Sequence, residues 1–271
     1  MSTQPALVMP DFNKLAAQFD LLLPFKAPVG EAIFDRLPRL LPGTHVLDLA
    51  CGTGEPGLSL IQRHPGTFLL GIDAAPAMID AARRKAARAS LPNARFEVMP
   101  MQTLNIETSS IDIVISRFGF MMIEDWTKSV AEMARVLKPG GHYAFASWDE
   151  MRFNVLVQLS LSVLRNRVPE SLYAFLLTLD GLAASGRREA QLRAAGLATV
   201  ITELFSWEYV FPDFTFIWDA MTRSLEHAFS HMNAEQREDA RLQLQDLLAP
   251  YRTQHGAYLI RNSCRLFWGE R

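Results

Sequence analysis

The sequence predicts an α/β protein built on a doubly wound, mostly parallel sheet, and three observations support this. Between about Leu41 and Asp149, short β-branched or apolar runs alternate with longer helical patterns, as repeated βαβ units do. A glycine-rich turn follows the first of these runs. Two further extended runs appear late in the chain, among apolar helices. With 271 residues, 49% of them hydrophobic, the chain is long enough to bury a large core.

The first half of the chain should contain five strands. They are expected at His45–Ala50, Thr67–Ile72, Arg95–Val98, Ile111–Ser116 and His142–Trp148. Helices are expected at Pro56–Arg63, Ala75–Ala89 and Asp125–Leu137, with two more ahead of the first strand at Asn13–Phe19 and Glu31–Leu37. The Ala75–Ala89 helix has a proline in its first turn, where the missing N–H costs nothing. The sequence Lys138-Pro139-Gly140-Gly141 should stop the Asp125–Leu137 helix and turn the chain into the fifth strand.

The pattern changes beyond Met151, where helices become more frequent than strands. Helices are expected at Phe153–Arg167, Leu172–Leu179, Phe214–Met232 and Ala234–Leu248, and strands at Val200–Phe211 and Asn262–Trp268. The two late strands pair most simply as an antiparallel edge of the earlier sheet. We therefore expect residues 1–150 to form a ligand-binding core with N-terminal helices. Residues 151–271 should form a helical substrate lid together with the last two strands of the core sheet.

Charge and cysteine content narrow the class of protein. Lys and Arg number 27 against 29 Asp and Glu, so there is no basic stripe for a phosphate backbone, and we expect no nucleic-acid partner. Only Cys51 and Cys264 are present, which favours a reducing cytoplasm over a secreted disulfide scaffold. No run of residues has the length of a membrane span. We expect a cytoplasmic protein with a small-molecule substrate and no stable membrane insertion, and its oligomeric state stays open.

The glycine-rich turn carries the main functional signal. Gly52 and Gly54 allow a tight bend and a close approach of a ligand, and with Gly57 they also satisfy the dinucleotide pattern G-x-G-x-x-G. A nicotinamide or flavin enzyme must therefore be considered. Asp48 argues against it, because a carboxylate at the strand end would repel a pyrophosphate. The same carboxylate would attract S-adenosylmethionine, which carries an ammonium and a sulfonium group.

A second acidic residue follows at the end of the next strand. Asp73 stands at the spacing at which a carboxylate meets ribose hydroxyls, and it can accept two hydrogen bonds from such a diol. The alternative for the pair is that Asp48 is a solvated strand-end residue and Asp73 only caps the following helix.

Three stretches of sequence together resemble class I S-adenosylmethionine-dependent methyltransferases, and within them the ubiquinone/menaquinone C-methyltransferase-like group. The stretches are Val46-Leu47-Asp48-Leu49-Ala50-Cys51-Gly52-Thr53-Gly54, Gly71-Ile72-Asp73 with Met78, and Arg135-Val136-Leu137-Lys138-Pro139-Gly140-Gly141. The resemblance covers roughly Phe12 to Trp148. It implies a seven-stranded Rossmann-like methyltransferase fold with a reversed final strand and S-adenosyl-L-methionine as cofactor.

The resemblance also implies positions for the cofactor. The methionine part should lie against Asp48, Gly52 and Gly54, with Ala50 and Thr53 in the same loop. The ribose should meet Asp73, and the adenosine should be flanked by Ala74 and Met78. The segment Ser116-Arg117-Phe118 should pass beneath the cofactor near the substrate.

One departure from the group concerns adenine recognition. The group usually has Gly-Asp-Ala after the third strand, whereas this chain has Met99-Pro100-Met101-Gln102. Pro100 has no side-chain acceptor for the adenine amino group. Adenine recognition should then rest on packing by Met99 or Met101, on a backbone group, or on Gln102.

The sequence identifies no catalytic residue. Methyl transfer from a sulfonium needs orientation more than a base, although a base would help with a hydroxyl or carbon acid. Asp149 or Glu150 could serve as that base or merely cap a helix. The candidates for substrate contact are Arg117, Met121 and Trp148, although Arg117 and Trp148 could equally be packing residues.

The histidines are poor candidates for a catalytic role. His45, His64 and His142 are expected at the sheet end opposite the ligand. His227 and His231 could share a helix face as metal ligands do, but no third ligand is evident, so we expect a solvated pair and no metal.

Together these observations predict an enzyme that transfers a methyl group from S-adenosylmethionine to carbon or oxygen of a small, partly hydrophobic metabolite. Two alternatives stay open at this point. One is a protein of the same fold without transferase activity, either a cyclase or a noncatalytic partner. The other is a dinucleotide-dependent oxidoreductase.

Overall fold

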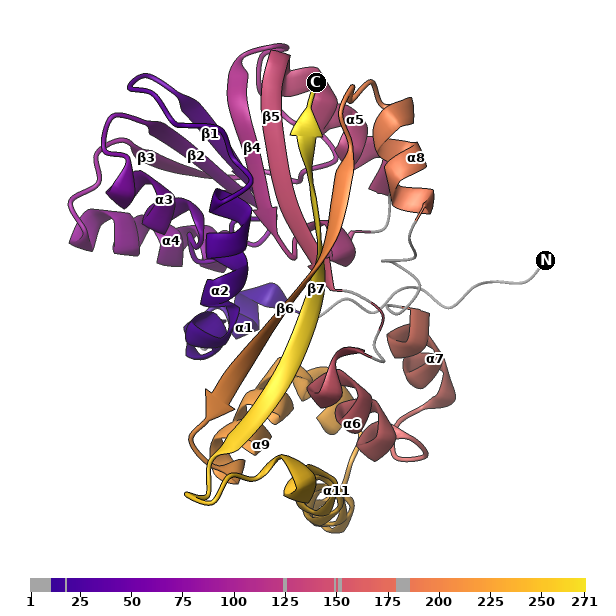
Figure 1. Ribbon diagram of the computed structural model, residues 1–271. Helices are drawn as coiled ribbons and strands as arrows, with labels where there is room; N and C mark the ends of the chain where they lie inside the picture. The colour runs from indigo at the N-terminus through magenta and orange to yellow at the C-terminus, as the bar shows by residue number, and fades with distance from the viewer. Residues whose placement is uncertain (1–10, 18, 124–125, 149, 151–152, 179–185) are drawn as a thin grey trace. The chain divides into compact units, whose positions relative to one another are not determined.

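The computed structural model describes residues 11–17, 19–123, 126–148, 150, 153–178 and 186–271 (Figure 1). Seven strands form one sheet in the order β3-β2-β1-β4-β5-β7-β6. Strands β1 to β5 pair in parallel, and β7 pairs antiparallel with β5. The predicted doubly wound, mostly parallel seven-stranded sheet is confirmed.

The strands lie close to their predicted positions. Their bounds are β1 (His45–Leu49), β2 (Phe68–Asp73), β3 (Ala94–Val98), β4 (Ile111–Arg117), β5 (Leu137–Trp148), β6 (Ile201–Phe211) and β7 (Tyr258–Glu270). Strand β5 begins at Leu137 rather than at His142. Its pairing with β4 starts at Leu137 and shifts register before His142, so the proline and glycines that we expected to precede the strand form an irregularity within it.

Eleven helices are defined within the described residues. They are α1 (Phe12–Leu15), α2 (Leu23–Phe34), α3 (Gly57–Arg63), α4 (Pro76–Arg88), α5 (Trp126–Val136), α6 (Val155–Leu164), α7 (Glu170–Thr178), α8 (Arg187–Ala194), α9 (Phe214–Ser224), α10 (Glu226–Phe229) and α11 (Ala234–Leu248). Helix α11 has the predicted bounds, and Asn233 and Gln236 form a capping box at its start. None of the described helices is long and apolar enough to cross a membrane.

One helix prediction was wrong, and one helix was missed. The helix expected at Glu31–Leu37 is instead α2, which continues through Pro28. Proline removes one backbone hydrogen bond, but α2 buries an apolar stripe that includes Phe25, Val29 and Ile33. Helix α8 was not predicted, because its sequence is mostly polar and only Leu192 is buried.

Two further predicted helices are shorter than expected. The helix expected at Asn13–Phe19 is reduced to α1, followed by a 3₁₀ helix at Phe19–Leu22. The helix expected at Phe214–Met232 is divided into α9 and α10, because the backbone at Leu225 leaves the helical region.

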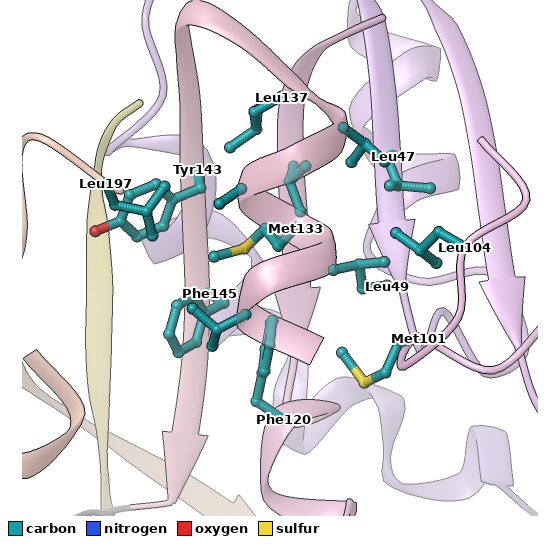
Figure 2. Close-up of a cluster of buried hydrophobic side chains, with 14 of the residues drawn as sticks. Leu47, Leu49, Met101, Leu104, Phe120, Met133, Leu137, Tyr143, Phe145 and Leu197 are labelled. Atoms are coloured by element: carbon teal, nitrogen blue, oxygen red, sulfur yellow. The ribbon is translucent and has the colours of Figure 1, made fainter. Parts of the chain in front are cut away.

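The main core lies between the sheet and helices α5 and α8. Figure 2 shows Met133 of α5 among side chains of β1 and β5, including Leu47, Leu49 and Phe145. Leu192 of α8 belongs to the same cluster and is fully buried. This core holds the parallel strands in place, so that their carboxyl ends form one edge.

The described residues divide into two compact units. One contains β1 to β5 and the described residues of 11–148, 186–205 and 264–271, and the other contains the described residues of 150–178 and 206–263. Strands β6 and β7 each contribute residues to both units. The role of the helical second unit as a substrate lid stays a prediction.

Candidate cofactor site

The glycine-rich turn forms a left-handed bend between β1 and α3. Ala50, Gly52 and Gly54 have φ angles of 55°, 54° and 100°. A Cβ on Gly54 would lie only 2.7 Å from the side chain of Leu58. Glycine is therefore required at position 54 both for conformation and for space, and the bend brings its backbone to the carboxyl edge of the sheet.

Asp48 is completely buried beneath this bend. Its Oδ2 accepts a hydrogen bond from the backbone N–H of Gly57 at 3.1 Å, whereas its Oδ1 has no hydrogen-bond partner among the described residues. Burial raises the pKa of Asp48 to about 8, although the charge of Arg117 opposes this rise. An unpaired buried carboxylate oxygen is costly, and a ligand that carries an ammonium group would supply the missing donor. The residues present therefore fit the cationic methionine part of S-adenosylmethionine.

Asp73, at the end of β2, connects two backbone segments. Its Oδ2 accepts from the N–H of Gly52 at 3.0 Å and its Oδ1 accepts from the N–H of Ala75 at 2.9 Å. Burial raises its pKa, and these hydrogen bonds oppose the rise. Asp73 thus holds the backbone N–H of the residue that precedes α4, although no side chain caps the first turn of that helix. Each carboxylate oxygen still has acceptor capacity for a ribose hydroxyl.

The N-terminal segment covers the glycine bend, and the sequence interpretation missed it. A ring carbon of Phe19 lies 3.3 Å from the Cβ position of Gly52. Asp20 accepts a hydrogen bond from the hydroxyl of Thr53 at 2.5 Å and pairs with Lys85 at 2.6 Å. The nearest signal in the sequence is Lys26, a single cation in an otherwise apolar run from residue 21 to 29.

Arg117 and Phe118 end β4 at the same edge. The Arg117 guanidinium donates to the carbonyl oxygens of Lys26 at 3.3 Å and Glu55 at 3.1 Å. Phe118 has a φ of 65°, and its ring stacks on Trp148 with centroids 4.2 Å apart. The Trp148 ring also lies 6.2 Å from that of Phe25. Trp148 is therefore part of an aromatic stack, and direct contact between it and a substrate stays a prediction.

The remaining predicted residues differ in how available they are. Ser116 is buried and donates its hydroxyl to the carbonyl of Leu49 at 2.7 Å. Met101 is buried in the main core (Figure 2), and Met78 is buried against the N-terminal segment. Gln102 and Met121 are half-buried and Ala74 is exposed. Their contacts with a ligand stay predictions.

The histidines of the described residues do not form a metal site. His45 begins β1, His64 follows α3 and His142 lies within β5. The rings of His227 and His231 are 5.4 Å apart, but α10 ends between them. Within the described ranges no group of three metal-ligating side chains exists.

The roles of the two candidates for a base, Asp149 and Glu150, stay predictions. Asp149 lies outside the described residues. Glu150 is described, but it stands alone between residues that are not, so its role as a base or a helix cap stays a prediction.

Comparison with known proteins agrees with this geometry. Residues 46–141 match a family model described as a methyltransferase domain. Over 139 residues the chain is 34% identical to a demethylmenaquinone methyltransferase of Thermus thermophilus, which covers 48% of this chain and 60% of the relative. It is 30% identical over 138 residues to the aklanonic acid methyltransferase DauC of a Streptomyces species, covering 50% and 62%. The chain therefore spans less than two thirds of either relative.

A solved structure shares the fold. It is phosphoethanolamine N-methyltransferase 2 of Haemonchus contortus in complex with S-adenosyl-L-methionine, at a TM-score of 0.61 and 15% identity, covering 97% of this chain and 60% of that one. At this identity the likeness concerns the fold alone. Residues 46–141 thus match the methyltransferase domain family, and the chain is similar in sequence to demethylmenaquinone and ubiquinone/menaquinone C-methyltransferases.

Proposed function

We propose that the protein transfers the methyl group of S-adenosylmethionine to carbon or oxygen of a small, partly hydrophobic molecule. The observation that carries this proposal is the buried Asp48 carboxylate, whose Oδ1 lacks a partner beside the left-handed glycine bend. A cationic amino-acid ligand would stabilise the ionised form of Asp48, whereas a diphosphate would destabilise it.

The protein's own residues would mainly bind and orient the cofactor. When bound, S-adenosylmethionine supplies a methyl group on a cationic sulfur that is already a good leaving group. Asp48 and the bend at Gly52 and Gly54 would hold the methionine part, and Asp73 would hold the ribose. Correct alignment of donor and acceptor can then supply most of the rate enhancement. Because no described side chain is placed as a base, we assign no proton transfer.

The acceptor class rests on two further observations. The stacked Phe118 and Trp148 rings lie where β4 and β5 end, next to the bend, and they give this edge an aromatic character. The names of two relatives give demethylmenaquinone and aklanonic acid as their substrates. We propose an acceptor of similar hydrophobic character. We also propose a cytoplasmic location, in keeping with a sequence that has only two cysteines, both of them buried.

Two experiments separate this function from its alternatives. Equilibrium binding by calorimetry should detect S-adenosylmethionine and S-adenosylhomocysteine but not NAD or FAD; binding of a dinucleotide alone would support an oxidoreductase. Incubation of the protein with cofactor and a panel of quinones, polyketides and isoprenoids should then release S-adenosylhomocysteine. Cofactor binding without product from any acceptor class would favour a noncatalytic protein of the same fold.

A further inference from the structure

Two basic side chains, Lys26 and Arg117, interact electrostatically near the glycine bend, and neither forms an ion pair with a carboxylate of the described residues. The Lys26 ammonium lies 4.3 Å from the centroid of the Phe19 ring, and no carboxylate of the described residues forms an ion pair with it. Among the described residues, the Arg117 guanidinium donates to the two backbone carbonyls of Lys26 and Glu55, which carry no net charge. Their positive charges are therefore not neutralised by a direct salt bridge.

Both cations lie close to the predicted position of the methionine moiety. Phe19, which Lys26 contacts, covers Gly52. Arg117 donates to the carbonyl of Glu55, within the bend itself, and interacts electrostatically with Asp48. Arg117 thus interacts electrostatically both with the buried Asp48 and with Lys26.

The other acidic groups near this region are already engaged. Asp20 pairs with Lys85 and accepts from Thr53. The Glu55 carboxylate accepts from the backbone N–H and the hydroxyl of Ser59. Neither is within ion-pair distance of Lys26 or Arg117, so a bound anion is the missing partner.

We propose that Lys26 and Arg117 bind the α-carboxylate of S-adenosylmethionine, while Oδ1 of Asp48 accepts a hydrogen bond from its α-ammonium group. An α-amino acid carries a carboxylate and an ammonium group on one carbon atom. The site offers Lys26 and Arg117 for the carboxylate and Asp48 for the ammonium group. The inference rests on the proposed function and adds two positioning residues to it. Arg117 also bridges α2 to the bend through its two carbonyl contacts, so it would align the cofactor with the N-terminal segment.

The ionisation of Lys26 agrees with this assignment. Burial and the neighbouring charge of Arg117 lower its pKa to about 7, although Asp20 opposes the shift. A carboxylate ligand would offset the repulsion between the two cations. A bound anion at this position would therefore stabilise the charged forms of Lys26 and Arg117.

A matched pair of ligands tests the proposal without turnover. Calorimetry without acceptor would compare S-adenosylmethionine with decarboxylated S-adenosylmethionine, which differs only in the lost carboxylate. The wild-type protein should bind the complete cofactor about 10- to 100-fold more tightly, the range expected for charge-assisted hydrogen bonds. Lys26→Met and Arg117→Met should lose most of this preference while binding the decarboxylated ligand as the wild type does. Arg117→Lys should recover part of it.

The controls separate the ways in which the idea can fail. Arg84→Met, on the exposed surface of α4, removes the same charge and should keep the full preference. Equal loss of both ligands in the Lys26 and Arg117 variants would overturn the carboxylate assignment, and so would a wild-type protein that binds both ligands equally. If Arg117→Met does not fold, Lys26→Met decides alone, because its ammonium group makes no hydrogen bond in the described structure. A wild-type protein that binds neither ligand would instead refute the proposed function.

Discussion

Asp48→Asn should change how the stability of the free protein depends on pH. The Asp48 carboxyl group ionises near 3.8 when unperturbed and near 8 in the folded protein, where burial disfavours its charge. The folded state therefore binds this proton more tightly than the unfolded state does. Its stabilising contribution is complete below pH 3.8 and is lost progressively as the pH rises toward 8.

The magnitude follows from these two values. Within the window each pH unit reduces the free energy of unfolding by about 1.4 kcal/mol. Between pH 6 and pH 9 the loss flattens above the folded pKa, so the wild type should lose about 2 to 3 kcal/mol relative to the variant. Asparagine has nearly the same shape, can still accept from the Gly57 N–H and does not titrate.

Urea denaturation of both proteins at pH 6, 7, 8 and 9 measures this difference directly. Contributions from groups shared by both proteins cancel when the two profiles are subtracted. The same variant should bind S-adenosylmethionine about 10- to 100-fold more weakly, because it loses a charged acceptor for the ammonium group. Parallel stability profiles would show that Asp48 is not a buried carboxyl group with a raised pKa, and the reasoning would fail.

Three further outcomes are expected. In the Lys26→Met variant, cofactor binding at pH 7 should release close to one proton, because the ammonium group of the cofactor lowers the raised pKa of Asp48. Calorimetry in buffers of different ionisation enthalpy measures this release, and proton uptake would contradict the prediction. Gly54→Ala should destabilise the protein more than Gly43→Ala: both have a positive φ, but only Gly54 lacks room for a Cβ. Urea denaturation should give about 1 kcal/mol for Gly43→Ala, and an equal loss at both positions would contradict the packing argument. Ser116→Ala should cost about 1 to 3 kcal/mol by leaving a buried carbonyl of β1 without its donor, and an unchanged denaturation midpoint would argue against that hydrogen bond.

Local sequence signals determined the parallel sheet and the position of the ligand edge. Strand-forming runs and the helices between them follow periodicities that each segment carries on its own. A glycine bend after a strand, with an acidic residue ahead of it, is likewise a local pattern. The meeting of Asp73 with the bend was predictable because neighbouring parallel strands end at the same edge, and its hydrogen bond to Gly52 agrees with that expectation.

Segments whose structure depends on tertiary packing rather than on local helix propensity were harder to predict. Helix α8 is stabilised by the burial of Leu192 in the core. The polar sequence of the helix contains no signal that predicts this contact. Helix α2 tolerates Pro28 because its apolar side chains are buried. Met101 was considered for the adenine and lies in the main core.

The amino-acid sequence by itself therefore determined the fold class, the glycine bend and the two acidic side chains at its edge. Only the tertiary structure revealed that Phe19 covers the bend, that the charge of Arg117 acts on both Asp48 and Lys26, and that Trp148 is part of an aromatic stack. The physical reason is the range of the interactions. Backbone periodicity and turn chemistry act between near neighbours in the chain, whereas the charge balance of a buried site depends on residues that are brought together only when the chain folds.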